Sequence, residues 1–322
     1  MNFGKKLFCA AAIAALTATA AFCAYPTKQI TVIQGFKAGG GSDAIAQMTQ
    51  PFLEKILGQT FVNQYLPGAA GAIGYTRLAK GSKPDGYTIG IINTPHLYAD
   101  YIMNPSISYR LPDVIPLANI VTDPGVIVVA KDSPIKDAAD FLAKVKAAAG
   151  KMTIGNGGVG SDDFFSSLIF KKLTGIEFQM VPFEGDGPAW QAAMGQKVDV
   201  TFTNIGIAFP QIKAGNLRAL AIFADKRYDQ MPDVPTMKEL GIDLVNGSSR
   251  GYAAPAGTPK EIVDTLISAF KQMAAMPEFQ QVLIDRATIM DMMYGEDFAA
   301  WLAEQDKTYV ALWDEVKGQL QK

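Results

Sequence analysis

Short β-branched segments alternate with longer segments of helical periodicity along most of the chain. Residues 30–33 form a typical strand pattern, and residues 44–57 place apolar side chains at helical spacing until a glycine ends the pattern. The same succession returns over 61–80, at 87–92 and again through 136–222. Such alternation is the pattern of βαβ units on a mostly parallel sheet, so it predicts an α/β fold.

Chain length and two expected crossings predict two lobes. A chain of 322 residues is long enough for two compact units. The segment 117–129 is almost entirely apolar apart from a break at 122–124, and it is the expected first crossing, with the return at 225–235. The predicted division places residues 25–120 and 236–322 in lobe 1 and residues 121–235 in lobe 2.

The amino-terminal residues 1–24 have the composition of a signal peptide. Two lysines precede an apolar run over 7–21 that is too short to span a bilayer, and polar residues follow. Small residues allow cleavage near 21–24, and the sequence does not rank these positions. Lipidation of Cys23 is an alternative that the bulky Phe22 disfavours. The segment predicts export to the periplasm.

The remaining composition excludes several classes of protein. Cys9 and Cys23 are the two cysteines, and both lie in or beside the leader, so the mature chain should have no disulfide and no cysteine-bound metal. Loss of the two leader lysines takes the net charge from −2 to about −4, and no basic block occurs, which argues against nucleic acid as a partner.

Three glycine-rich loops follow expected strands, at 36–43, 155–163 and 181–188. Ligands of open parallel sheets bind beyond the carboxyl ends of the strands. Glycines let the backbone approach a ligand, and N–H groups at a helix N-terminus favour an anion, so a carboxylate could be held without an arginine. Capping of the following helix by Ser42 or Asp43 is the simpler role of the first loop. None of the loops fits a nucleotide-binding motif.

We find no catalytic constellation in the sequence. His96 is the single histidine and follows an expected strand, where it either lines a cleft or lies in a loop. With one histidine and no nucleophile motif, we expect no enzyme, no metal site and no cofactor. Asp162 and Asp163 could hold a cation, but capping of the following helix explains them more simply.

The mature chain contains a series of short motifs. They include Pro67-Gly68-Ala69-Ala70-Gly71, Pro84-Asp85-Gly86-Tyr87, Gly195-Gln196-Lys197-Val198-Asp199, Asp233-Val234-Pro235-Thr236 and Ala254-Pro255-Ala256-Gly257-Thr258-Pro259. On these motifs the sequence resembles the substrate-binding proteins of tripartite tricarboxylate transporters, the Bug or TctC-like receptors. The resemblance implies a type II periplasmic-binding-protein fold, in which two α/β lobes joined by two hinge crossings enclose a ligand cleft.

The resemblance also implies which residues contact a ligand. Members of this family typically bind carboxylates with the loop after the first strand and with the glycine-rich loop of the second lobe. By position, the first loop contributes Phe36, Ala38, Gly39, Gly40, Gly41, Ser42 and Asp43, and the second contributes Gly157, Gly158, Gly160, Ser161, Asp162 and Asp163. The pocket wall would include Asn93, Thr94, Phe183, Glu184, Thr203 and Asn204.

Departures from the family pattern bear on the identity of the ligand. Glu184, Asp162 and Asp163 bring negative charge where many relatives carry a lysine and a histidine, so a tricarboxylate would be repelled. Arg250 stands where many relatives have an aromatic pair. It is a candidate counter-charge for a ligand carboxylate, or alternatively a member of a structural ion pair.

These observations favour a monomeric periplasmic receptor that closes its lobes on a small organic acid, either a mono- or dicarboxylate or an amino-acid-like ligand. The resemblance implies delivery of that ligand to membrane subunits of the tripartite tricarboxylate type. The alternative is an exported sensor subunit that signals to a membrane kinase. The sequence does not separate these two functions, and it does not identify the acid.

Overall fold

The computed structural model describes residues 25–286 and 288–319. The predicted signal peptide, its cleavage near 21–24 and both cysteines lie outside the described residues. Among the residues that are described, no helix is both long enough and apolar enough to cross a membrane.

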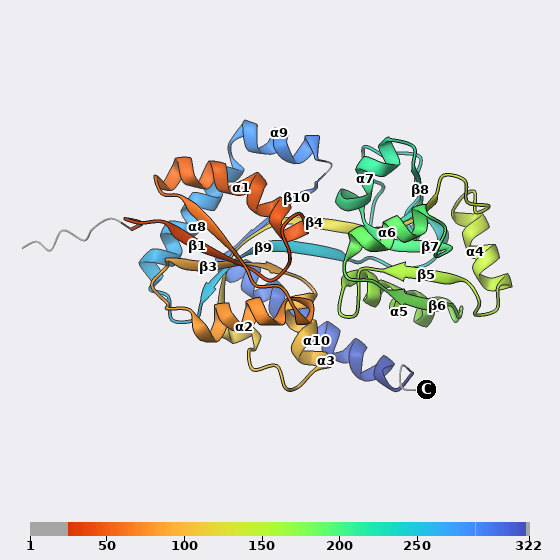
Figure 1. The fold of residues 1–322 in the computed structure, drawn as a ribbon, viewed down its shortest axis with the longest axis horizontal. Coiled ribbons are helices and arrows are strands. Elements are labelled where there is room, and N and C mark those ends of the chain that lie inside the picture. Colours follow the sequence, from red (N-terminus) through yellow and green to blue (C-terminus); the bar gives the residue numbers. More distant parts are fainter. Residues whose placement is uncertain (1–24, 287, 320–322) are drawn as a thin grey trace, which may run out of the picture.

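Helices account for much of the described chain and lie on both faces of the sheet (Figure 1). Their bounds are α1 Gly41–Leu57, α2 Ala72–Gly81, α3 His96–Met103, α4 Ala138–Ala147, α5 Asp162–Thr174, α6 Asp186–Met194, α7 Ile205–Lys213, α8 Lys260–Ala274, α9 Pro277–Asp285 and α10 Gly295–Val316.

The described strands join in a ten-stranded mixed sheet whose main order is β2-β1-β3-β9-β4-β7-β5-β6, with β8 and β10 also paired to β4. Their bounds are β1 Ile30–Gln34, β2 Phe61–Tyr65, β3 Thr88–Asn93, β4 Val114–Ala130, β5 Thr153–Asn156, β6 Gln179–Pro182, β7 Val200–Asn204, β8 Leu217–Phe223, β9 Gly247–Pro255 and β10 Met290–Tyr294. The α/β prediction is confirmed.

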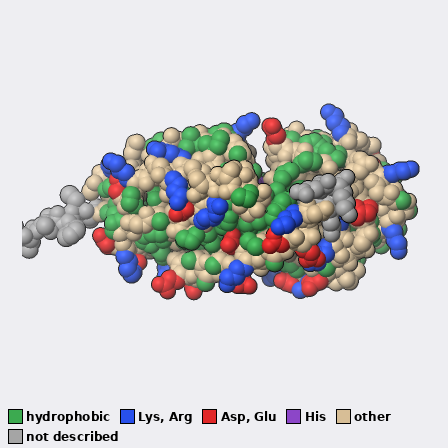
Figure 2. All heavy atoms as spheres, turned by 90° about the horizontal axis from the view of Figure 1, so that it is seen from below, with side chains coloured by type: hydrophobic (Ala, Val, Ile, Leu, Met, Phe, Trp, Pro, Cys, Tyr) green, Lys and Arg blue, Asp and Glu red, His purple; other side chains and the backbone are tan. Residues whose placement is uncertain are grey.

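Two lobes lie side by side and share the long strand β4 (Figure 1). The first half of β4 pairs with β9 and β10, and its second half pairs with β7 and β8. In the space-filling view the outline is hollowed between the two lobes (Figure 2). The predicted lobe boundaries at residues 120 and 235 stay a prediction.

The break expected at 122–124 does not interrupt β4. Asp123 pairs with Ser248, and Pro124, which has no N–H to donate, pairs with Gly247. A Cβ atom at Gly247 would lie 2.4 Å from the carbonyl oxygen of Asp123, so only glycine permits this close approach. The crossing is therefore one continuous strand that carries a buried carboxylate at its middle.

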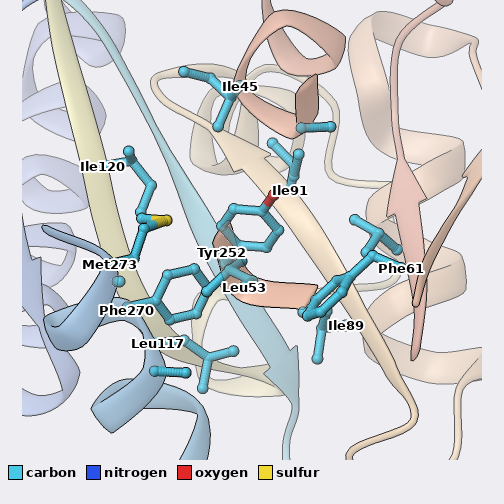
Figure 3. Close-up of a cluster of buried hydrophobic side chains, with 14 of the residues drawn as sticks. Ile45, Leu53, Phe61, Ile89, Ile91, Leu117, Ile120, Tyr252, Phe270 and Met273 are labelled. Carbon is cyan, nitrogen blue, oxygen red and sulfur yellow. The ribbon is translucent and has the colours of Figure 1, made fainter. Parts of the chain in front are cut away.

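The core of the first lobe fills the space between the sheet and helices α1 and α8 (Figure 3). The ring centroids of Tyr252 and Phe270 lie 4.9 Å apart, and both residues are almost fully buried. The Tyr252 hydroxyl hydrogen-bonds with Thr49 Oγ1 at 2.7 Å, which satisfies its polar end inside the core.

A second apolar cluster joins the lobes on the side of α3, α5 and α10. We call it the interlobe cluster, and its central members are Tyr98, Phe164, Phe165, Leu168 and Tyr309. The ring centroid of Tyr309 lies 4.7 Å from that of Phe165 and 5.0 Å from that of Tyr98. The second lobe is thus packed against the C-terminal helix by buried aromatic surface, and α5 lies at that contact.

Candidate functional site

The first glycine-rich loop connects β1 to α1 and is closed by Asp43. The carboxylate of Asp43 accepts hydrogen bonds from the Gly39 N–H at 2.8 Å, from Gln47 Nε2 at 2.8 Å and from the Tyr65 hydroxyl at 2.6 Å. Burial raises the pKa of Asp43, but these hydrogen bonds outweigh it and the pKa is lowered. Gly40 is the N-cap, and neither Ser42 nor Asp43 caps α1, so the capping alternative does not describe this loop.

Ser42 and Asn93 lie together at the inner end of this loop. Asn93 Nδ2 donates to Ser42 Oγ at 2.8 Å, and the two side chains are buried. A Cβ atom at Gly41 would lie 2.8 Å from Arg250 Nε, so the absence of a side chain there makes room for the guanidinium. Arg250 also pairs in register with Asn93 across β3 and β9.

Arg250 lies between the lobes, where β4 and β9 pass from one lobe to the other. Its Nη1 is 3.4 Å from Asp123 Oδ2, and its Nη2 donates to Asn204 Oδ1 at 3.3 Å. The Gly206 N–H donates to the other oxygen of Asp123 at 2.8 Å. Burial raises the pKa of Asp123 to about 6, because it outweighs the nearby guanidinium charge. The ion pair is buried, but Arg250 Nε has no hydrogen-bond partner within residues 25–286 and 288–319.

The second glycine-rich loop connects β5 to α5. Ser161 Oγ accepts from the Phe164 N–H at 3.0 Å and caps the helix. Asp162 Oδ2 instead accepts from Asn204 Nδ2 at 2.6 Å. Burial and the neighbouring Asp186 carboxylate raise the pKa of Asp162 to about 7. Serine therefore performs the capping role that the sequence suggested for the acid pair.

The cap gives a direct prediction for Ser161→Ala. The variant should lose about 1 kcal/mol of free energy of unfolding, because the Phe164 N–H at the start of α5 would lose its acceptor. Urea unfolding followed by circular dichroism measures the change. Ser268→Ala on the exposed face of α8 is the matched control and should change stability by less than about 0.5 kcal/mol. Equal stability of the two variants would contradict the capping role.

The third loop, between β6 and α6, folds over the second. The Phe183 N–H donates to the Asn156 carbonyl at 3.1 Å, and the Gly185 N–H donates to the Gly157 carbonyl at 3.1 Å. Phe183 is half-buried and Glu184 is exposed, whereas Asp186 has a buried Oδ1 atom. The loop therefore turns Asp186, rather than Glu184, toward the interior.

His96 is not a loop residue, because it begins α3. Its ring contacts that of Phe36 edge-on, with centroids 5.1 Å apart. Burial lowers the pKa of His96 to about 4, with Asp186 opposing this shift and Arg250 adding to it. The imidazole is therefore neutral at pH 7, and it lies close enough to Asp186 and Arg250 for both charges to affect its pKa.

The structure places some of the predicted ligand residues near Arg250 and others away from it. Gly41, Asn93 and Asn204 lie next to Arg250, and Ser42 and Asp162 hydrogen-bond with the last two. Ala38, Gly39 and Glu184 are exposed. Thr94 points to the other face of β9, because its hydroxyl hydrogen-bonds with the backbone of Ser249. The role of all the predicted residues in ligand binding stays a prediction.

Three residues of this region were not among the expected contacts: Asp123, Asn156 and Asp186. Asp123 is the one charged residue in β4. A single charged residue in an otherwise apolar crossing could have identified it as a functional residue from the sequence. Asn156 ends β5 and its Oδ1 accepts from the Gly158 N–H at 3.0 Å. Asp186 lies in the third glycine-rich loop, but nothing in the local pattern distinguishes it from Glu184.

Unsatisfied polar atoms gather in this region. Nine buried side-chain nitrogen and oxygen atoms lack a hydrogen-bond partner in the described part of the chain. Seven of them belong to His96, Asn156, Asp163, Asp186, Thr203 and Arg250. Because buried polar groups are nearly always hydrogen-bonded, such a concentration indicates a place where water or a ligand completes the structure.

A separate cavity of about 670 Å³ lies on the opposite face of the crossing strands. Thr122, Pro124, Gly247 and Ser249 line it, whereas Asp123 and Arg250 do not. Successive side chains of a strand point to opposite faces, so this cavity and the Arg250 region are on different sides of β4 and β9. Of the expected contacts, only Thr94 lines the cavity.

Within the described residues no group of three or more histidine, cysteine, aspartate or glutamate side chains is arranged to hold a metal ion.

Comparison with known proteins places these features in a family. The sequence model described as the tripartite tricarboxylate transporter family receptor, TctC, matches residues 45–316. A Cupriavidus necator protein described as "UPF0065 protein in gbd 5'region" is 30% identical over 301 residues, which cover 93% of this chain and 91% of that protein. Protein BugT of Bordetella pertussis is 32% identical over 255 residues, which cover 78% of each chain.

Two solved structures are similar to this chain over most of its length. MatC from Rhodopseudomonas palustris with bound malate has a TM-score of 0.79 at 28% identity, over 91% of this chain and 99% of that one. A second R. palustris protein, solved with adipate, has a TM-score of 0.81 at 27% identity, over 91% of this chain and 97% of that one.

Proposed function

Because this chain belongs to the TctC family of tripartite tricarboxylate transporter receptors, which are solute-binding receptors, we propose that it captures a small carboxylate between its two lobes. The proposed ligand is a mono- or dicarboxylate or an amino-acid-like acid. The protein acts in the periplasm, exported by the signal peptide that the sequence predicts. It delivers the ligand to membrane subunits of a tripartite tricarboxylate transporter, and catalysis plays no part in this function.

The observation that carries the proposal is the concentration of unpartnered buried polar atoms around Arg250. These atoms come from both lobes, with His96 and Arg250 on one side and Asp163 and Asp186 on the other. A ligand that hydrogen-bonds with both groups binds the closed arrangement of the lobes more tightly than any open one. Its binding energy therefore favours closure.

Arg250 is the proposed contact for a ligand carboxylate. Its Nε is buried without a partner and lies beside Gly41, at the start of α1. A carboxylate oxygen placed there would accept a charge-assisted hydrogen bond from the guanidinium, and backbone N–H groups at the start of α1 would add to it. The malate and adipate bound by two structural relatives are both dicarboxylates, which supports this class of ligand.

A tricarboxylate fits this region poorly. Asp123 and Asp162 lie near the single buried guanidinium, and Asp186 is close to both of these carboxylates and to Asp163. A third carboxylate on the ligand would add negative charge to a region that already has more carboxylates than cations. The proposal therefore excludes citrate and similar acids.

A thermal-shift panel tests the proposal. The protein is unfolded, dialysed and refolded to remove any bound ligand, and is then heated with acetate, succinate, malate, adipate, citrate and the common amino acids. We expect one monoacid, diacid or amino acid to raise the melting temperature by several degrees, since binding to the native state alone stabilises it. Citrate should leave it unchanged. If no acid in the panel raises the melting temperature, the proposal is wrong.

A further inference from the structure

Asp163 is the most unusual side chain in the proposed site. It is fully buried, and as an ionised carboxylate neither of its oxygens has a hydrogen-bond partner among the described residues. The Gly157 N–H approaches the carboxylate and lowers its pKa, but without the distance and angle of a regular hydrogen bond. A buried carboxylate in this state is costly unless it is protonated or something else supplies positive charge or donors.

Asp186, the first residue of α6, approaches Asp163 from the end of the third loop. A Cβ atom at Gly157 would lie 2.7 Å from Asp186 Oδ1 and 3.1 Å from Asp163 Oδ2, so both oxygens border the same small space. Asp186 Oδ1 is also buried without a partner. Burial, the neighbouring carboxylates of Asp162 and Asp186, and a side-chain hydrogen bond with Asp186 raise the pKa of Asp163, so the two acids share a proton when no cation is bound. One unpartnered oxygen from each acid therefore lies beside Gly157.

The surrounding cations do not neutralise this pair of carboxylates. Arg250 is already engaged by Asp123 and Asn204. His96 is neutral at pH 7, because burial lowers its pKa to about 4. Capping does not explain Asp163 either, since Ser161 caps α5. Without a bound cation, the two acids therefore have each other as neighbours and no positively charged partner among the described residues.

We propose that Asp163 and Asp186 bind a positively charged ammonium group of the ligand, so that the captured acid is zwitterionic. This inference rests on the proposed function and narrows it to one ligand class. An ammonium group has three N–H donors, which matches the three unpartnered oxygens. Arg250 binds the carboxylate of the same molecule, and His96 is close enough to both Asp186 and Arg250 for each charge to affect its pKa.

A divalent cation fits the same oxygens less well. Calcium takes six to eight oxygen ligands and magnesium requires a near-octahedral set. No suitable group of three or more metal-binding side chains occurs among the described residues. The two carboxylates therefore favour a compact organic cation that needs few donors.

Matched pairs of acids test the inference by isothermal titration calorimetry on the refolded protein. The pairs are L-aspartate and succinate, L-glutamate and glutarate, L-alanine and propionate, and 4-aminobutyrate and butyrate. In the pair that binds best, we expect the ammonium-bearing member to bind about 100-fold more tightly or better. Equal or tighter binding of the acid that lacks an amine would overturn the inference while leaving the proposed function in place. Binding by no member of any pair would overturn both.

Variants locate the ammonium contact. Asp163→Asn and Asp186→Asn should each reduce the selectivity within the best pair to less than about tenfold, because a charged acceptor is lost. Asp132→Asn, an exposed acid in the same lobe, is the control and should keep the full selectivity. Retention of full selectivity in both site variants would overturn the assignment. The comparison of wild-type affinities decides the ligand class even if Asp163→Asn does not fold.

Discussion

Arg250→Met should lower the affinity for the best acid of the thermal-shift panel by about a hundredfold or more, which is equivalent to roughly 3 kcal/mol. The guanidinium is buried, its Nε has no protein partner, and no other arginine or lysine among the described residues is buried. Loss of this charge would leave the ligand carboxylate close to Asp123 and Asp162 without a cation. Isothermal titration calorimetry at pH 7 measures the change.

The ion pair with Asp123 complicates this experiment, and a double variant separates the two roles. Removal of Arg250 alone leaves the buried Asp123 carboxylate unpaired, so the single variant should also lose stability. The double variant Arg250→Met, Asp123→Asn removes both charges and should recover much of that stability while binding remains weak. Arg77→Met, on the exposed face of α2, should bind like the wild type. Wild-type affinity in the double variant would show that Arg250 is only a structural ion-pair partner.

The local pattern of the sequence was sufficient to predict the fold. Alternating strand and helix periodicity, with glycine-rich loops at 36–43 and 155–163, depends on residues that are close in sequence. The loops at these positions do connect β1 to α1 and β5 to α5. The same local reasoning missed the continuity of β4, because a Thr-Asp-Pro triplet normally ends a strand. Here Gly247 on β9 allows the close backbone approach that keeps the pairing intact.

The arrangement of the site depends on contacts that local patterns do not contain. Arg250 is beside Asn93 because β9 returns between β3 and β4 in a particular register. Asn204 connects Arg250 to Asp162 through one amide, which requires the second lobe to be in place. The sequence therefore suggested Arg250 as a counter-charge but could not identify Asp123 as its partner. It also could not tell which acid of the third loop points inward.

Phe165→Ala should have the second large effect, a loss of about 3–5 kcal/mol in the free energy of unfolding. The ring is fully buried in the interlobe cluster, with its centroid 4.7 Å from that of Tyr309 and 5.6 Å from that of Phe164. Truncation would leave a cavity between α5 and α10. Urea unfolding measures the loss, and a change below about 1 kcal/mol would contradict the packing role.

The more informative consequence of Phe165→Ala is a change in ligand affinity. Helix α5 carries the predicted ligand residues at its first turn and the interlobe cluster along its length, so looser packing against α10 should alter how the second lobe closes. Phe141→Ala is the matched control, because this buried ring lies inside the second lobe, 5.8 Å between centroids from Phe170. Both variants should lose similar stability, but only Phe165→Ala should change the dissociation constant, by about threefold to tenfold. An equal change in both variants would mean that general destabilisation, and not the contact between α5 and α10, controls binding.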